Sequence, residues 1–246
     1  ASAVSTEFAS GIANRMNFAV TEKNIAGQTL GQRFAEITAD FVRKSFMMLD
    51  HLRPGKWEVS TSQASGGITL YDQYEHIAQL QKVLNENAEL KTALGGDYLI
   101  TPDILVSRCA EPDDKINENA ALLESGDRAV EYSPLRERNV PKCPAILHAT
   151  VSCKWTIRSD RAQNTRTEAL NLIRNRKGNT PHIVCVTFEP HPGRLASLAL
   201  GTGDLDCMYH AALFELMEAT ADSERPDQAD LMEQLVQGRR LRDITD

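Results

Sequence analysis

The chain has 246 residues, of which 41% are hydrophobic and 25% charged, and a formal net charge of −7. This is an ordinary soluble globular composition for one large or two small domains, and no apolar run approaches the roughly 20 residues of a membrane helix. The acidic balance by itself argues against nucleic acid as a partner. The first residues have no basic start and no apolar core, so we expect no signal peptide. Because the chain starts with Ala1, we also expect some N-terminal sequence to be missing or processed.

The spacing of apolar residues predicts alternating strands and helices. In chain order it predicts a helix over 29–50, a strand from Trp57, a helix over 71–94, strands over 98–107 and 145–157, a helix over 162–177, a strand over 182–188, and helices over 205–221 and 229–241. Strands interleaved with helices indicate a single α/β domain.

Three stretches between these elements are typical of turns or loops. Residues 110–144 are polar and proline-rich, which predicts an irregular excursion with at most one short helix and a variable or interface role. Residues 190–193, Pro-His-Pro-Gly, predict a rigid turn. Residues 201–204, Gly-Thr-Gly-Asp, predict a turn in which Asp204 caps the following helix.

The five cysteines are scattered and odd in number. No CxxC pair occurs, which argues against a zinc site or a disulfide framework. Cys153 and Cys185 lie in apolar runs, where cysteine usually acts as a small buried hydrophobe. This usage predicts a reducing cytoplasm.

A lysine and two carboxylates provide the groups needed to cut a phosphodiester bond. Asp103 and Glu168 could bind Mg²⁺, while Lys154 could orient or deprotonate water or neutralise a phosphate oxygen. Ser152 and Lys154 share one face of the predicted strand, and Cys153 faces the other side with its carbonyl available to a metal. Singly, each has an ordinary structural explanation, such as a strand-entry cap for Asp103 and a solvated ion pair for Glu168.

A local excess of positive charge follows Lys154. Residues 154–177 hold seven basic and two acidic side chains, which leaves −12 for the rest of a chain whose net charge is −7. Within it, Arg158, Asp160 and Arg161 lie at the junction of strand and helix. Arginine pairs with guanine O6 and N7, and aspartate accepts from cytosine N4, so the triplet can read G and C. Alternatively, Asp160 caps the helix and the arginines are simply exposed.

The segment 151–164, VSCKWTIRSDRAQN, resembles the NgoMIV family of type II restriction endonucleases, a CCGG-reading branch of the PD-(D/E)xK nucleases. The similarity runs from about residue 10 to the C-terminus. Further similar segments are 27–29, 51–55, 101–104, 171–178 and 199–203. The resemblance implies a central mixed β-sheet flanked by helices, with the restriction-endonuclease-like PD-(D/E)xK core, as one domain over residues 1–246.

The resemblance also implies a role for each candidate catalytic residue. Asp103 is the metal-binding acid, and Ser152 and Lys154 form a modified SxK segment whose Cys153 carbonyl helps to bind metal. Glu168 is the displaced second acid, brought in from the helix because Ser152 occupies the usual strand position. The implied cofactor is Mg²⁺, with two ions in each active site.

For DNA recognition, the resemblance implies that Arg158, Asp160 and Arg161 read the CCGG core in the major groove. Arg194 matches a reader of the outer guanine, and Gln28 a minor-groove reader near the centre. The implied partner is double-stranded DNA with the palindrome GCCGGC, cut to leave 5′ overhangs by a prokaryotic homotetramer of two dimers. A two-fold dimer matches a palindrome in symmetry.

One position departs from the family pattern. The resemblance implies a metal-binding glutamate directly after the helix phenylalanine, whereas here Ala35 follows Phe34 and Glu36 comes one place later. One residue turns a helix by about 100°, so Glu36 should point elsewhere. Either a local register shift brings Glu36 into the catalytic site, or metal binding is weakened.

Three functional hypotheses follow. The first is a Mg²⁺-dependent, sequence-specific DNA endonuclease. The second is a catalytically weakened DNA-binding protein of the same fold, with Ala35 marking the lost activity. The third is a repair or recombination nuclease that reads DNA structure and not sequence.

Overall fold

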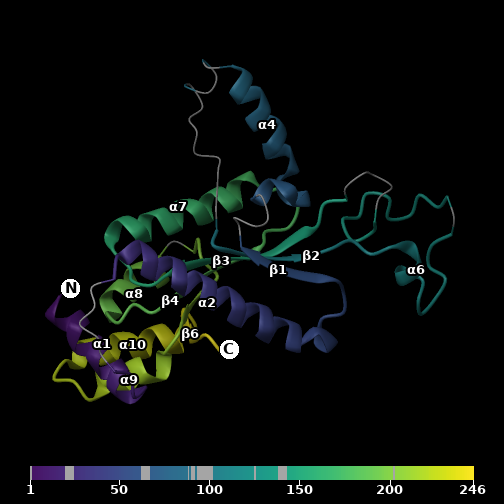
Figure 1. The fold of residues 1–246 in the computed structure, drawn as a ribbon. Coiled ribbons are helices and arrows are strands. Elements are labelled where there is room, and N and C mark those ends of the chain that lie inside the picture. The colour runs from purple at the N-terminus through teal and green to yellow at the C-terminus, as the bar shows by residue number, and fades with distance from the viewer. Residues whose placement is uncertain are drawn as a thin grey trace. The chain divides into compact units, whose positions relative to one another are not determined.

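The computed structural model of the chain shows helices and strands in alternation (Figure 1). The residues it describes are 2–19, 25–61, 67–87, 89, 92, 102–124, 126–137, 143–201 and 203–246, without the side chains of 159–161. The helices of this part are Ala3–Arg15 (α1), Gly27–Met48 (α2), Glu75–Glu86 (α4), Asp113–Ile116 (α6), Ser159–Asn175 (α7), Pro192–Ala199 (α8), Leu213–Ala221 (α9) and Pro226–Gln237 (α10). Short 3-10 helices cover Asp50–Leu52, Ile68–Leu70 and Asp72–Tyr74.

The strands form one mixed sheet in the order β1-β2-β3-β4-β5-β6. They are Trp57–Thr61 (β1), Ile104–Arg108 (β2), Ile146–Lys154 (β3), His182–Thr187 (β4), Cys207–His210 (β5) and Leu241–Asp243 (β6). β1 pairs antiparallel with β2, whereas β4, β5 and β6 are parallel, with Cys185 opposite Met208 and Met208 opposite Leu241. The prediction of an α/β fold with a central mixed sheet and flanking helices is confirmed.

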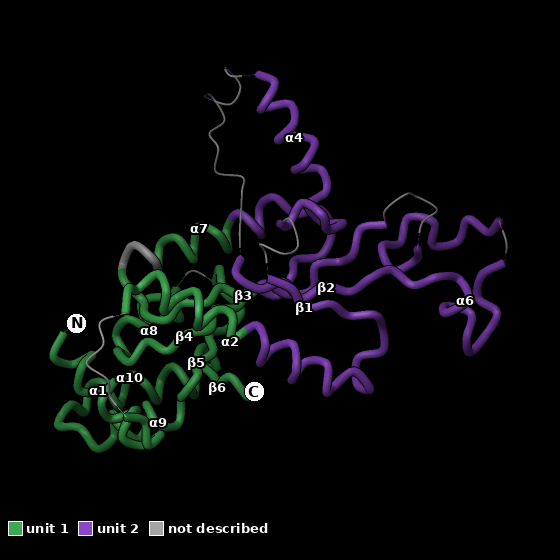
Figure 2. Tube along the Cα trace, viewed as in Figure 1, with its two compact units in different colours: residues 1–38, 151–170, 183–246 green, residues 39–150, 171–182 purple. Residues whose placement is uncertain are grey.

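The chain divides into two compact units (Figure 2). Unit 1 comprises residues 1–38, 151–170 and 183–246, and unit 2 comprises 39–150 and 171–182. The interpretation of residues 1–246 as a single domain stays a prediction. Among the described residues, no helix is both long and apolar enough to cross a membrane.

In unit 1, helix α1 packs closely against α9. Ser2 caps its N-terminus, and Phe8 and Ile12, one helical turn apart, are buried. A Cβ atom on Gly11 would lie 2.8 Å from the Cβ of Ala219, so a glycine is needed for this approach of the two helices. No helix was predicted over this stretch.

In unit 2, a buried glutamine bonds the backbone of β3 much as a neighbouring strand would. The Gln73 amide donates to the Leu147 carbonyl at 2.7 Å and its oxygen accepts from the Leu147 N–H at 2.9 Å. The adjacent Tyr74 is fully buried and donates its hydroxyl proton to the Leu172 carbonyl at 3.0 Å. Burial raises the pKa of Tyr74 well above its usual value, so it acts as a neutral donor.

Most predicted elements are confirmed, but the prediction for residues 205–221 is wrong in its first part. Residues Cys207–His210 form strand β5, and α9 begins only at Leu213. β5 lies within a parallel part of the sheet and three of its four residues are buried, so its sequence is apolar without alternation. Such a short run cannot be told from a helix by periodicity. The interpretation of Asp204 as a helix cap is therefore also wrong.

Other boundaries also differ from the prediction. Residues 190–193 are not only a turn, because α8 begins at Pro192, where a missing N–H costs nothing in the first helical turn. Leu241 belongs to β6, and α10 ends at Gln237. The predicted short helix within 110–144 is confirmed as α6. Of the predicted helix over 71–94, α4 covers only Glu75–Glu86, because the chain is extended at Asn87. The predicted strand residues 98–101 lie outside the described residues.

We expect Gln73→Leu to lower the free energy of unfolding by about 2–4 kcal/mol. The change leaves two buried backbone groups of Leu147 without a partner, at roughly 1–3 kcal/mol each. Gln79→Leu, on the exposed side of α4, is the matched control and should change stability by no more than about 0.5 kcal/mol. Urea unfolding measures both, and equal effects would contradict this role for Gln73.

Candidate active site and DNA-reading pocket

A hydrogen bond joins the predicted SxK segment to the predicted displaced acid. Ser152 lies near the end of β3 and is 7% exposed, and its Oγ donates to Oε2 of Glu168 at 3.2 Å. Glu168 is half-buried on α7, which follows β3 in the chain. The local fold of unit 1 therefore brings a helix carboxylate to the strand position that Ser152 occupies.

Lys154 ends β3 and is held there through its backbone. Its carbonyl accepts a hydrogen bond from Oγ1 of Thr187 at 2.7 Å, and Thr187 is fully buried at the end of β4. Lys154 itself is half-buried, while Cys153 is buried at 6% exposure. Because this strand end is held, the backbone position from which the Lys154 side chain extends is also fixed.

Asp103 belongs to unit 2, where it directly precedes β2. It is half-buried between two buried residues, Pro102 and Ile104. Across the described part of the chain, no group of three or more His, Cys, Asp or Glu side chains gathers as a metal cluster. Within unit 1, the Glu168 carboxylate and the Cys153 carbonyl are oxygen donors of the kind that Mg²⁺ takes, an ion commonly held by one or two carboxylates that keeps several waters.

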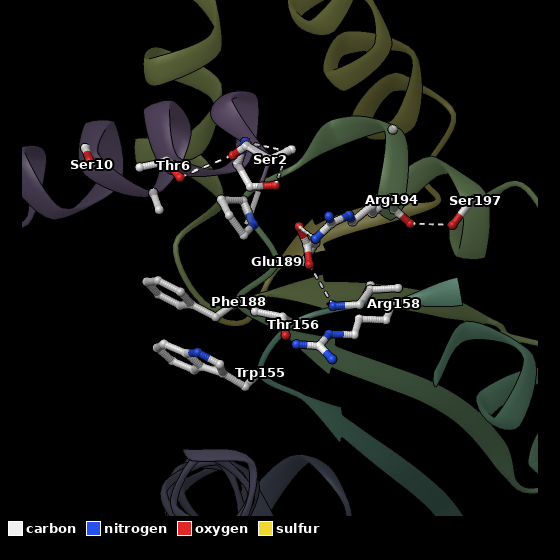
Figure 3. A pocket seen from close by; sticks show the side chains of 15 residues that line it. Ser2, Thr6, Ser10, Trp155, Thr156, Arg158, Phe188, Glu189, Arg194 and Ser197 are labelled. Atoms are coloured by element: carbon white, nitrogen blue, oxygen red, sulfur yellow. Dashed lines mark hydrogen bonds and ion pairs between the residues drawn. The ribbon is translucent and has the colours of Figure 1, made fainter. Parts of the chain in front are cut away.

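Two of the three arginines predicted to read bases, Arg158 and Arg194, line one pocket in unit 1 (Figure 3). The cavity measures about 1020 Å³ and is formed by α1, the β3–α7 junction and the β4–α8 segment. Arg158, which is exposed, comes from the junction, and half-buried Arg194 comes from the first turn of α8. Sequence positions 36 residues apart are thus brought together.

A buried carboxylate between these arginines was missed in the sequence interpretation. Glu189 is 0% exposed, and its Oε2 accepts from the Ile157 N–H at 2.7 Å. Its Oε1 accepts from the His191 N–H at 3.0 Å and lies 3.5 Å from Nη1 of Arg194. The available signal was an acid just after an apolar parallel strand, where sites in α/β proteins commonly form.

Stacked rings form one wall of the same pocket. Figure 3 shows Trp155 and Phe188 stacked. Their ring centroids are 4.9 Å apart and the interplanar angle is 1°. Phe34 meets Trp155 edge-on at 5.6 Å, and His210 lies behind Phe188 at 5.8 Å. These ring contacts hold the peptide segments that carry Arg158 and Glu189.

The buried imidazole of His210 holds the backbone beside Glu189. Its Nδ1 accepts from the Ala212 N–H at 3.0 Å, so the proton is assigned to Nε2, which donates to the Glu189 carbonyl at 3.1 Å. Burial lowers the pKa of His210 to about 4. The ring is therefore neutral near pH 7.

Other predicted site residues lie on helices at the surface or have no described side chain. α7 begins at Ser159, so Asp160 lies inside its first turn and not at the cap position, and the side chains of Asp160 and Arg161 lie outside the description. Gln28 is exposed near the start of α2. Glu36 is also exposed and accepts from the Gln32 side-chain amide at 3.1 Å.

The whole chain matches one protein family. The sequence profile described as NgoMIV restriction enzyme matches residues 1–246. The chain belongs to this family. The type II restriction enzyme NgoMIV of Neisseria gonorrhoeae is 47% identical over 98% of this chain and 84% of its own length.

Membership in the NgoMIV family makes the protein a type II restriction endonuclease, a DNA-binding hydrolase that cleaves DNA at specific sites. This confirms the resemblance stated from the sequence. It also favours the two hypotheses of sequence-specific recognition over a nuclease that reads DNA structure.

We expect stability to fall as pH is lowered from 7 to 5, in part because of His210. The unfolded imidazole, with a pKa near 6.5, binds a proton in this range, whereas the folded one, with a pKa of about 4, does not. The contribution of His210 to the free energy of unfolding is therefore fully present above the unfolded pKa. It is lost as the pH falls below that value, by about 2 kcal/mol at pH 5. In urea unfolding at pH 7, 6 and 5, His210→Gln should remove this part of the loss. Parallel pH curves for the two proteins would contradict the assignment.

Proposed function

We propose that this restriction endonuclease cuts double-stranded DNA at a palindrome with a CCGG core, GCCGGC, and leaves 5′ overhangs. The observation that carries the proposal is the hydrogen bond from Ser152 to Glu168. It supports a catalytic site in which a carboxylate from α7 replaces the acid that a strand would otherwise carry. Lys154, on the same strand, adds the positive charge that phosphodiester cleavage needs.

In this proposal, the carboxylates of Asp103 and Glu168 and the Cys153 carbonyl hold Mg²⁺, with two ions in each active site. When bound, Mg²⁺ stabilises the charge on the attacking and leaving oxygens. The Lys154 ammonium orients the attacking water and neutralises a non-bridging phosphate oxygen. Ser152 keeps the Glu168 carboxylate in place by donating its hydroxyl proton.

Base reading is assigned to residues of three segments: the junction of β3 with the start of α7, the first turn of α8, and the start of α2. Arg158, Asp160 and Arg161 read the CCGG core in the major groove, Arg194 reads the outer guanine, and Gln28 contacts the minor groove near the centre. The shared pocket of Arg158 and Arg194 supports adjacent readouts of inner and outer base pairs. Each bidentate contact between arginine and guanine contributes roughly 1–3 kcal/mol of discrimination.

The proposed assembly is a homotetramer of two dimers, each holding one palindrome across a two-fold axis. In such a dimer, both halves of the site meet the same residues. We place its action in the prokaryotic cytoplasm, where the DNA substrate is accessible.

Digestion of a plasmid of known sequence with Mg²⁺ should give discrete fragments whose ends map to GCCGGC with 5′ overhangs. Lys154→Ala should abolish cleavage but retain binding, since it removes the catalytic ammonium and no proposed base contact. Arg158→Ala should lose the preference for CCGG sites, because the variant lacks a bidentate guanine contact.

Two results would oppose the proposal. Ends mapped to sites without CCGG would contradict the assigned recognition sequence. Cleavage of CCGG sites by Arg158→Ala at the wild-type rate would show that this arginine does not read the core. Gel filtration of the free protein at several concentrations tests the tetramer.

A second candidate is a catalytically weakened DNA-binding protein, favoured by the residues after Phe34. Ala35 is half-buried, whereas Glu36 is exposed and bonded to Gln32. Within α2, Glu36 therefore already has a partner on the exposed side of the helix. This arrangement supports weakened metal binding over a register shift that brings Glu36 into the site.

If the site is weakened, Ala35→Glu should restore a metal-binding carboxylate. We expect the Mg²⁺ concentration for half-maximal cleavage to fall roughly 10–100-fold, the range found when a group supporting a metal site is changed. Ile37→Glu adds the same charge at a position on α2 that is 70% exposed, and is the matched control. Cleavage that is unchanged by Ala35→Glu would rule out the weakened-site explanation.

A further inference from the structure

We propose that Glu189 is the positioning residue of the DNA-reading pocket, the group that holds Arg194 and the segment before Arg158 in one arrangement. The inference rests on the proposed function, because it concerns how that site discriminates DNA sequences. Glu189 contacts both segments in the structure and is itself fully buried. It therefore acts through the two arginines and not by touching the base pairs.

The carboxylate of Glu189 is surrounded by donors. A buried carboxylate is tolerated only when it is paired and hydrogen-bonded. Here one oxygen accepts from the Ile157 N–H at 2.7 Å, and the other accepts from the His191 N–H at 3.0 Å and lies 3.5 Å from Nη1 of Arg194. Both oxygens are used, so the orientation of the carboxylate is fixed by three groups from two segments.

The backbone of Glu189 is fixed as well. Its N–H donates to Oγ1 of Thr187 at 3.1 Å, and that hydroxyl donates to the Lys154 carbonyl at 2.7 Å. Its own carbonyl accepts from His210 at 3.1 Å. The residue thus connects the end of β3, which carries the proposed catalytic lysine, to the segment that leads into α8.

On one side, Glu189 positions the segment that carries Arg158. The bonded Ile157 is 1% exposed and directly precedes Arg158, whose side chain lines the pocket. Fixing the Ile157 N–H sets the direction in which the chain leaves β3. The direction of the Arg158 side chain from that point depends on this peptide.

On the other side, Glu189 contacts Arg194 through a single guanidinium nitrogen. A guanidinium has five N–H donors in a planar fork. Contact through Nη1 holds one end of the guanidinium. Nε and Nη2 carry further donors, which can contact the edge of a base. Figure 3 shows Arg194 directed toward Glu189 from α8. An arginine held in this way loses less freedom when DNA binds.

A merely structural carboxylate in the same unit provides a matched control. Asp243 is buried at 6% exposure and accepts hydrogen bonds from the Leu213 and Thr245 N–H groups. It contacts no arginine of the pocket and does not line it. Asp243→Asn and Glu189→Gln thus make the same chemical change, and only the second alters the pocket.

The test measures binding in Ca²⁺ to three duplexes, GCCGGC, ACCGGT with the outer pair exchanged, and GACGTC with the core exchanged. The wild type should prefer GCCGGC over ACCGGT by tenfold or more. Glu189→Gln should reduce this preference to about threefold or less, because an amide has one acceptor oxygen and cannot serve both sides. Asp243→Asn should keep the wild-type preference.

A double variant tests whether Glu189 acts through Arg194. Adding Glu189→Gln to Arg194→Ala should remove no further outer-pair preference, as expected when one residue acts through the other.

A wild-type outer-pair preference in folded Glu189→Gln overturns the proposal. If the affinity for all three duplexes also falls by an equal factor, the role of Glu189 is structural alone. If circular dichroism shows that Glu189→Gln does not fold, Glu189→Asp is measured instead, since one fewer methylene cannot span both segments, and a retained preference overturns the proposal. A wild type without preference for GCCGGC means that the proposed function itself has failed, and the two failures are thereby distinguished.

Discussion

The burial of one carboxylate, Glu189, beyond the end of β4 is the constraint on which the pocket lined by Arg158 and Arg194 depends. Removing a carboxylate from water is costly unless donors replace the lost hydration. The donors here are two backbone N–H groups and the guanidinium of Arg194. Because these donors belong to the segments that follow β3 and β4, satisfying the charge also fixes those segments relative to each other within unit 1.

A second carboxylate is held by a hydrogen bond at the end of β3. The strand itself carries Ser152 where an acid would otherwise stand, and Glu168 reaches this residue from α7. The hydroxyl of Ser152 satisfies one carboxylate oxygen and keeps the acid at the strand. Burial of Ser152 at 7% exposure makes this bond more than a surface contact, because a buried hydroxyl also needs a partner.

Much of the fold could be predicted from the sequence, for reasons that also explain the failures. α2 and α7 are long and amphipathic, and the strands β3 and β4 are apolar runs bounded by clear breaks, so periodicity identified them. β5 has only four residues, most of them buried, and its pattern contains no helix-or-strand signal. α8 begins at a proline within a sequence that also encodes a turn, and only packing decides between the two.

The candidate site was predictable in part. One strand, the helix after it and the junction between them carry Ser152, Lys154, Arg158 and Glu168, so sequence order alone groups these residues. Arg194 was assigned only through the family resemblance, since its approach to Arg158 depends on the three-dimensional arrangement of β4 and α8. Glu189 was missed because a single acid before a proline looks like an exposed turn residue, and its burial results from tertiary contacts.

An acidic protein can read DNA if its positive charges are concentrated where phosphates and bases lie. The chain carries −7 overall, yet residues 154–177 hold seven basic and two acidic side chains. At physiological ionic strength, exposed charges more than about 8 Å apart are largely screened. The acidic remainder therefore weakens the close contacts of these basic side chains little, and the same screening leaves little long-range attraction to DNA. Binding then depends on close contacts. The proposed readout of a guanine by Arg194, whose guanidinium contacts the buried Glu189, is a contact of that kind.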